Sequence, residues 1–307
     1  MAGFDQHHAM DSDLDLLHVG DAAHGRQDRD FEAHPAQFVG SDLVKRGLRA
    51  GLHRLGYEIT RQESRQETLG YDDEAAARAL IARVADSTMV PIRRLITLYQ
   101  QVRYCEEAAI PGSFVECGVW KGGSVGLMAL ANLQHGRQRR PLHLFDAFQD
   151  ICEPDAKVDG SRALDDVRRF APGGGTGGTL QPLTGFYDQF GGPGTLDGNR
   201  ELLERRIGYD PAMIHYHVGW FQDTVPRDAA ACGEIALLRL DGDWHASTKI
   251  CLEHLYERVV PRGVVIIDDY GTYEGCRKAV DDYLSMKGIK VLLNHVDADC
   301  RYWIKPG

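Results

Sequence analysis

The sequence has no long hydrophobic run and no excess of positive charge. No apolar stretch in its 307 residues approaches the roughly 20 residues that a helix needs to cross a bilayer. The first residues, which include His7, His8, Asp11 and Asp13, lack the basic and apolar regions of a secretory signal peptide. The formal net charge of −10 argues against non-specific binding to nucleic acid. We therefore expect a cytoplasmic protein with no membrane or nucleic-acid partner.

Paired cysteine motifs are also missing. The seven cysteines are scattered and odd in number, and no two of them form a Cys-x-x-Cys pair. Several lie within apolar strand or helix patterns, which indicates buried thiols in a reducing compartment and not a disulfide framework. These residues are Cys105, Cys117, Cys152, Cys232, Cys251, Cys276 and Cys300.

The N-terminal part differs in composition from the rest of the chain. Residues 1–40 are polar and rich in His and Asp, and we interpret them as a flexible or loosely docked arm. Residues 41–60 carry a basic amphipathic helical pattern, which could touch an acidic surface or a membrane. Packing against the protein or a second subunit is the favoured interpretation. Residues 1–84 are thus expected to form an arm and helical region that serves as a lid or in homo-oligomerisation.

Residues 85–307 alternate between strand and helix patterns. Further helices are predicted over 73–84 and 91–109, and Pro91 stands where proline is tolerated, at a helix start. The last two strands are separated by only four residues, so they must form a hairpin. The fold class is therefore α/β, a Rossmann-like seven-stranded sheet with a terminal antiparallel hairpin and an N-terminal helical region. Strands are predicted at 113–119, 142–148, 214–219, 234–241, 263–269, 291–296 and 301–305, and later helices at 123–135, 200–207, 246–259 and 273–287.

A glycine-rich segment, residues 155–198, interrupts this alternation. It includes the runs 173–178 and 191–194, in which glycine dominates. A long insertion at the carboxyl edge of a sheet is usually a functional lid or a disordered loop. We favour a mobile lid over the site.

Acidic residues follow two neighbouring strands of the predicted sheet. Asp241 and Asp243 come directly after one apolar run, and Asp268 and Asp269 follow the next. Because parallel strands joined by a crossover helix end at the same edge, we expect these carboxylates to meet in one crevice. Hard oxygen ligands suit magnesium or a similar divalent ion. The sequence therefore predicts a metal site.

A glycine turn before the helix at 123–135 could bind a cofactor. Gly118 and Gly122 allow backbone to approach a ligand, and Ser124 can cap the helix, whose free N–H groups suit an anionic group. The turn matches neither the P-loop nor the Gly-x-Gly-x-x-Gly pattern, and plain structural turns of this kind are common. Asp146, at the next strand end, suits a ribose diol, or it caps a loop. Trp220 and Phe221 could flank an adenine ring or simply pack.

Five motifs in order resemble those of the macrocin (TylF-type) O-methyltransferases, which are class I S-adenosylmethionine-dependent enzymes. The similarity covers roughly residues 85–307 and rests on residues 115–124, 145–148, 219–224, 238–243 and 267–270. The family methylates sugar hydroxyls in macrolide and aminocoumarin antibiotics. The first 70 residues and the long glycine-rich insertion depart from its pattern, and both are expected to border the acceptor.

The resemblance assigns roles to individual residues. It implies magnesium ligation by Asp241, Asp268 and Asp269 and places Asp243 at the position of the general base. It places Thr88 and Met89 over the methionine end of S-adenosylmethionine and Asp146 at its ribose. The full set implied for the cofactor is Thr88, Met89, Glu116, Gly118, Trp120, Gly122, Ser124, Asp146, Phe148, Gly219, Trp220, Phe221 and Asp241.

These assignments suggest a mechanism with catalytic residues Asp243, His245 and Asp241. Magnesium would chelate two vicinal hydroxyls and lower the pKa of one of them. Asp243, or His245 as second choice, would take the proton, although Asp243 could be an ordinary helix cap and His245 an exposed histidine. The alternatives are a metal-dependent phosphoryl-transfer or hydrolytic enzyme and a non-catalytic cofactor-binding protein. As the acceptor, a sugar diol on a secondary metabolite is favoured over a surface-polysaccharide sugar and over an aromatic catechol.

Overall fold

The computed structural model describes residues 16–21, 57–62 and 72–307, and the chain divides into two compact units at Gly70 and Tyr71. In the first unit, β1 (Leu16–Asp21) pairs antiparallel with β2 (Tyr57–Gln62). Most of the predicted arm and residues 41–56 of the predicted basic helix lie outside the described residues. The helix expected over 41–60 cannot reach its predicted end, because the backbone of β2 is extended from Tyr57. Alternating Tyr, Ile and Thr favour a strand there.

The second unit is built on a seven-stranded sheet with the order β5-β4-β3-β6-β7-β9-β8. The first five of these strands are parallel, whereas β9 pairs antiparallel with both β7 and β8. This confirms the predicted parallel sheet with a terminal hairpin. The strands are β3 (Ser113–Cys117), β4 (Leu142–Asp146), β5 (Ile214–Val218), β6 (Ile235–Leu240), β7 (Val259–Ile267), β8 (Asn294–His295) and β9 (Arg301–Ile304).

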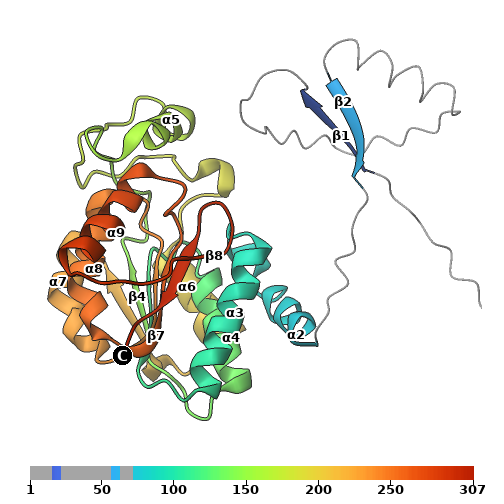
Figure 1. Ribbon diagram of the computed structural model, residues 1–307, viewed down its shortest axis with the longest axis vertical. Coiled ribbons are helices and arrows are strands. Elements are labelled where there is room, and N and C mark those ends of the chain that lie inside the picture. The colour runs from blue at the N-terminus through green and yellow to red at the C-terminus, as the bar shows by residue number, and fades with distance from the viewer. Residues whose placement is uncertain (1–15, 22–56, 63–71) are drawn as a thin grey trace, which may run out of the picture. The chain divides into compact units, whose positions relative to one another are not determined.

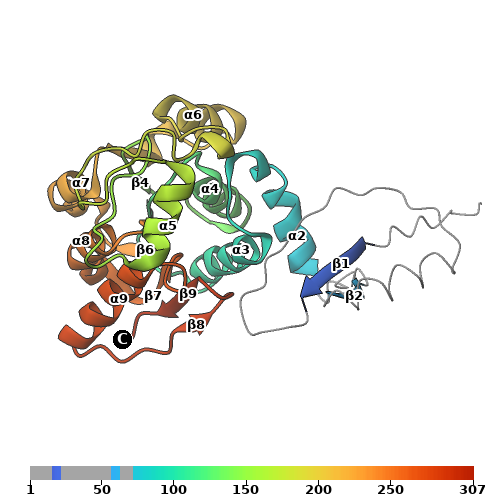
Figure 2. The same ribbon diagram turned by 90° about the horizontal axis from the view of Figure 1, so that it is seen from above.

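Helices cover both faces of this sheet, as the two views in Figures 1 and 2 show. One face carries α2 (Asp72–Ile81), α3 (Ile92–Glu107) and α4 (Gly123–His135). The other carries α7 (Phe221–Asp228), α8 (His245–Leu255) and α9 (Glu274–Met286). The apolar runs of β3 and β6 are buried throughout because helices pack on both of their sides. None of the helices in the described ranges is long and apolar enough to span a membrane.

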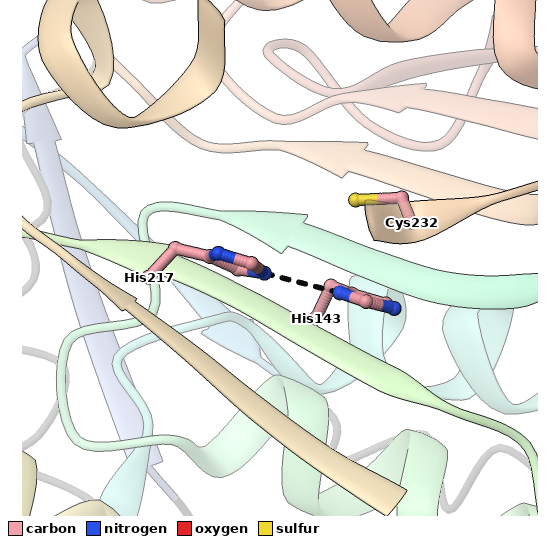
Figure 3. Close-up of side chains that lie close together, drawn as sticks. All are labelled: His143, His217 and Cys232. Atoms are coloured by element: carbon pink, nitrogen blue, oxygen red, sulfur yellow. Dashed lines mark hydrogen bonds between the residues drawn. The ribbon is translucent and has the colours of Figure 1, made fainter. Parts of the chain in front are cut away.

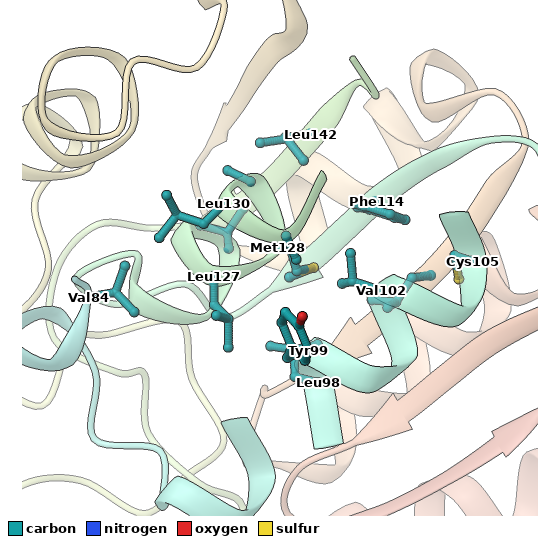
Figure 4. Close-up of a cluster of buried hydrophobic side chains, with 14 of the residues drawn as sticks. Val84, Leu98, Tyr99, Val102, Cys105, Phe114, Leu127, Met128, Leu130 and Leu142 are labelled. Carbon is teal, nitrogen blue, oxygen red and sulfur yellow. The ribbon is translucent and has the colours of Figure 1, made fainter. Parts of the chain in front are cut away.

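The core on the α3–α4 side forms around α4, whose residues 123–132 are all buried. Leu127 and Met128 of α4 lie against Tyr99 and Val102 of α3, with Phe114 of β3 behind them (Figure 4). A helix that is apolar on every side is stable only when it is covered on every side. Here the sheet, α2 and α3 provide that cover.

The glycine-rich segment holds more regular structure than its composition predicts. It contains α5 (Gly160–Phe170), a 3-10 turn at Asp188–Phe190 and α6 (Leu196–Arg200), which continues into a π-helical turn at Glu201–Arg206. Figure 1 shows α5 beyond one end of the sheet. Neither α5 nor α7 was predicted. Glycine masked the pattern of α5, and Pro226 lies inside α7.

Candidate active site

A cavity of about 340 Å³ opens at the carboxyl ends of the parallel strands. Its wall contains Gly118 after β3, Asp146 at the end of β4, Gly219 after β5 and Asp241 after β6. Crevices at this edge are the usual ligand sites of open α/β sheets. Of the residues predicted to bind a cofactor, the cavity wall includes Met89, Gly118, Trp120, Asp146, Gly219, Trp220, Phe221 and Asp241, and not Thr88, Glu116, Gly122, Ser124 or Phe148.

The glycine turn is a geometric requirement of the fold. Gly118 has φ +87°, and a Cβ atom there would collide with the backbone carbonyl of Asp241 on the neighbouring strand end. Gly122, also left-handed, stands at the N-cap of α4. The prediction that Ser124 caps this helix is wrong: α4 begins at Gly123, its cap makes no side-chain hydrogen bond, and Ser124 is buried within the first turn.

Asp146 ties this turn to the next strand. One carboxylate oxygen accepts hydrogen bonds from the backbone N–H groups of Val119 (2.6 Å) and Trp120 (3.1 Å), and the other accepts from Phe148 (2.6 Å). Burial raises the pKa of Asp146, and these three donors oppose the rise. The carboxylate therefore does cap the loops, and it still borders the cavity. Its role toward a ribose stays a prediction: the oxygen that accepts from Phe148 keeps a further lone pair, whereas the other oxygen already accepts two hydrogen bonds.

The acidic cluster forms as predicted. Ligand oxygens of Asp241, Asp268 and Asp269 lie within 4.8 Å of one another. Asp243 joins them through its backbone N–H, which donates to Asp269 at 3.2 Å, and its φ is +56°. Adjacent parallel strands β6 and β7 bring the two pairs together. The juxtaposition of carboxylates across two strand ends is thus present in the structure.

A buried arginine that the sequence reasoning missed lies beneath the cluster. Arg239 donates to Glu116 (2.6 Å), Asp241 (2.9 Å) and Asp268 (2.7 Å). Glu116 is fully buried; its Oε1 accepts from Arg239, and its Oε2 has no hydrogen-bond partner. Its role toward a cofactor stays a prediction. The sequence does contain a sign of this residue's role, because Arg239 is the one charged residue in the apolar strand 235–240.

A second arginine engages the outer side of Asp268. Arg94 of α3 donates to Asp268 at 2.6 Å and also pairs with Asp297 and Asp299. Both oxygens of Asp268 therefore accept from guanidinium groups, one from Arg94 and one from Arg239. Asp269 receives no such ion pair among the described residues, so its charge is the least compensated of the three.

The carboxylates of Asp241, Asp243 and Asp269 repel one another. Burial raises the pKa of Asp243 well above its usual value, and Asp241 and Asp268 raise it further. The pKa of Asp269 is raised in the same way, by burial and then by Asp243 and Asp241. Burial likewise raises the pKa of Asp241, although Arg239 opposes this. Without a cation, this site holds more negative charge than its arginines balance.

A hard divalent cation fits these residues. The donors are carboxylate oxygens within mutual reach, which is the ligand chemistry that magnesium prefers. Each oxygen of Asp268 can accept from arginine and still offer a lone pair. Asp241 and Asp269 would hold such an ion most directly, with Asp268 as the third ligand.

His245 lies apart from this arrangement. It is the first residue of α8, and its backbone N–H donates to Asp159 at 2.6 Å. It does not line the cavity, whereas Asp243 does. The structure therefore favours Asp243 over His245 as the residue that faces a bound acceptor.

The glycine-rich segment supplies an aromatic wall of the cavity, and its Tyr187 lies beside Trp120 of the glycine turn. Phe170, Phe186, Tyr187 and Phe190 line the cavity, and Phe170 contacts both Phe186 and Phe190 edge-on. Phe190 is 40% exposed. Three hydrogen bonds join the segment to the glycine turn. Trp120 Nε1 donates to the Gly192 carbonyl (3.2 Å), and Lys121 Nζ donates to the Phe190 and Gly191 carbonyls (3.0 Å each).

Comparisons of the sequence and of the structure with known proteins both find O-methyltransferases. The family model described as macrocin-O-methyltransferase (TylF) matches residues 48–171 and 201–305. The residues between these ranges, 172–200, belong to the glycine-rich segment and to α6.

Two characterised relatives come from Streptomyces. The 8-demethyl-8-(2,3-dimethoxy-alpha-L-rhamnosyl)-tetracenomycin-C 4'-O-methyltransferase of Streptomyces olivaceus is 34% identical over 246 residues, which cover 77% of this chain and 84% of that protein. Demethyldecarbamoylnovobiocin O-methyltransferase of Streptomyces niveus is 33% identical and covers 70% of this chain and 74% of its own length. Among solved structures, the O-methyltransferase NovP has a TM-score of 0.62 at 26% identity and covers 77% of this chain and 100% of its own.

Proposed function

The chain belongs to the macrocin-O-methyltransferase (TylF) family, and from this premise we propose that it transfers the methyl group of S-adenosylmethionine to a sugar hydroxyl of a glycosylated secondary metabolite. The observation that carries the proposal is the cavity itself. It joins the glycine turn to an acidic cluster on one side and an aromatic wall on the other.

The cofactor end of the cavity is assigned to the glycine turn and the segment after β5. Gly118 and Trp120 line the cavity at this turn, and Gly118 allows the backbone to approach the methionine moiety. Trp220 and Phe221 line the wall where an adenine ring would stack. Met89, 45% exposed, lies at the same opening and suits a residue that closes over the ligand.

The acceptor end is assigned to the acidic cluster and the aromatic wall. The tetracenomycin relative acts on a rhamnosyl group, and mycinamicin III 3''-O-methyltransferase of Micromonospora griseorubida is a further relative, 29% identical over 219 residues. A sugar carried on an apolar aglycone matches a site with carboxylates beside Phe170 and Phe190. Apolar rings of the acceptor would bury against these side chains.

The proposed chemistry needs one base and one oriented oxygen. Asp243 takes the proton of the acceptor hydroxyl, a new oxygen–carbon bond forms to the methyl group, and the carbon–sulfur bond breaks to leave S-adenosylhomocysteine. Asp241 and Asp269 would hold magnesium or a similar cation, which when bound supplies Lewis acidity that eases loss of the hydroxyl proton. Arg239 and Arg94 hold Asp268 in place.

The proposal extends to the cellular compartment and the oligomeric state of the enzyme. All seven cysteines are free and buried, which suits the cytoplasm, to which we assign the enzyme. A homo-oligomer stays part of the proposal, with the first 84 residues as its contact region.

Product analysis by mass spectrometry tests the proposal. Purified enzyme is incubated with S-adenosylmethionine and a panel of rhamnosylated aromatic polyketides, free sugars and simple catechols. We expect a gain of one methyl group on a glycosylated acceptor, its loss in chelator, and its loss in Asp243→Asn. Methylation of catechols alone, or full turnover in chelator, would contradict the acceptor or the metal assignment respectively.

A further inference from the structure

A second group of potential metal ligands lies away from the active-site cavity. His143 of β4, His217 of β5 and Cys232, which ends the 3-10 turn Ala229–Cys232, offer ligand atoms within 4.8 Å of one another. Figure 3 shows the two imidazole rings joined by a hydrogen bond, with the thiol beside them. All three side chains are buried, with residue exposures of 2%, 8% and 4%. None of them lines the cavity described above.

The hydrogen bonds fix how the rings are protonated. Asp228 of α7 accepts from Nδ1 of His217 at 3.1 Å, and its own pKa is lowered to about 2, chiefly by Arg227. With its proton on Nδ1, His217 presents a bare Nε2, which accepts from Nδ1 of His143 at 3.0 Å. A carboxylate behind a histidine is the usual outer partner of a metal-binding imidazole, because it orients the ring and raises its basicity.

The donors are held in their neutral forms. Burial lowers the pKa of His143 to about 3 and also lowers that of His217, with Asp228 opposing the latter shift. Burial raises the pKa of Cys232 to about 12, so the thiol keeps its proton until a cation displaces it. Neutral imidazoles are the form that binds metal, and no ammonium or guanidinium group bonds to these three side chains within the described residues.

The spacing suits a tetrahedral ion. Two nitrogens at about 2.05 Å from zinc lie about 3.3 Å apart at the tetrahedral angle, close to the 3.0 Å between the bonded rings. The sulfur, at most 4.8 Å from the nitrogens, must move by up to roughly 1 Å to complete bonds of about 2.3 Å. Because β5 is an edge strand and Asp228 is partly exposed, an ion can reach the site from the side of the sheet.

We propose that His143, His217 and Cys232 form a binding site for a zinc-class divalent ion. Two nitrogens and one sulfur select such an ion over magnesium, which prefers oxygen ligands. On binding, the proton between the rings moves to the other nitrogen of His143, and the thiol of Cys232 loses its proton to solvent.

The ion would fasten the edge of the sheet. It would join β4, β5 and the turn after α7, and the chain between the last two carries Gly219, Trp220 and Phe221 of the cavity wall. This inference does not depend on the proposed function, since none of its ligands belongs to the acidic cluster.

Cobalt absorption tests the site. The full chain, reduced and stripped of metal, is titrated with Co²⁺, whose bond to a thiolate gives a charge-transfer absorption in the near ultraviolet. Because histidines elsewhere in the chain also bind cobalt, only this thiolate absorption counts. We expect it to saturate at one equivalent, to disappear when Zn²⁺ is added, and to be lost in Cys232→Ser.

Two controls make the result specific. Cys105→Ser removes an equally buried thiol on α3 and should keep the absorption, as should Asp269→Asn in the acidic cluster. Absence of the absorption in the unsubstituted protein would overturn the proposal, whatever the stability of the variants. Its persistence in Cys232→Ser would overturn it as well.

Discussion

Replacing Asp269 by asparagine should change stability in opposite directions with and without a divalent cation. Asp269 is buried and has no ion-pair partner among the described residues, and burial together with Asp243 and Asp241 raises its pKa. A carboxyl whose pKa is higher in the folded than in the unfolded state destabilises the fold at neutral pH, because its ionised form is disfavoured there. In chelator, Asp269→Asn should therefore be at least as stable as the unsubstituted protein.

With magnesium present, the unsubstituted protein should be more stable than Asp269→Asn. A ligand that binds only the folded state at 100 times its dissociation constant stabilises it by about 2.7 kcal/mol. For a chain of 307 residues, 1 kcal/mol shifts the melting temperature by roughly 2–4 °C, so the expected rise is on the order of 5–10 °C. Asparagine removes the charge that attracts the ion, and the variant should lose this rise.

Thermal melts in chelator and in magnesium measure both effects. Asp159→Asn is a matched control, because Asp159 is buried and accepts hydrogen bonds from the backbone N–H groups of Asp155 and His245. Burial raises the pKa of Asp159 as it does that of Asp269, but Asp159 is not among the expected ligands, so Asp159→Asn should keep the full magnesium response. A full magnesium-induced rise in melting temperature in Asp269→Asn, or no rise in the unsubstituted protein, would contradict the assignment of Asp269 as a cation ligand.

Three further outcomes are expected. Arg239→Met should lower the free energy of unfolding by about 3–5 kcal/mol in urea melts, since it leaves buried carboxylates such as Glu116 unpaired; an unchanged midpoint would contradict this. Burial lowers the pKa of His143 to about 3 in the folded protein, against about 6.5 in the unfolded chain, so its contribution to stability is full above pH 6.5 and is lost as the pH falls below that value. Between pH 7 and pH 5 the metal-free protein should lose about 2 kcal/mol of unfolding free energy through this group. The variant His143→Gln should not show that loss. Phe190→Ala should raise KM for an acceptor with an aromatic aglycone several-fold while KM for S-adenosylmethionine stays unchanged, and equal changes in both would place Phe190 elsewhere.

The sequence predicts the sheet well because local pattern and topology agree there. The helix at 123–135 coincides with α4, and the four-residue gap before Arg301 correctly requires a hairpin. The meeting of Asp241 with Asp268 follows from one rule about parallel strand ends. It needs no knowledge of side-chain packing, which is why it succeeds.

Features that depend on how particular side chains from distant segments pack together were not predicted. Arg239 looks like an isolated charge in a strand until its three carboxylate partners come together from β3, β6 and β7. The pairing of His143 with His217 depends on the register of β4 against β5, and Cys232 joins them only through the packing of α7. In the glycine-rich segment, composition hides α5, whose charged face is exposed and whose Val167 packs against Leu183 and Phe186.

We propose that a divalent cation binds among Asp241, Asp268 and Asp269 beside the methyl donor. A crystal structure with S-adenosylhomocysteine and Mn²⁺, with anomalous diffraction measured at the manganese edge, tests it directly. We expect one strong anomalous peak within coordination distance of Asp241 and Asp269, next to the sulfur of the bound product. A ligand-filled cavity whose carboxylates show no peak, or a peak only at some other site, would contradict it.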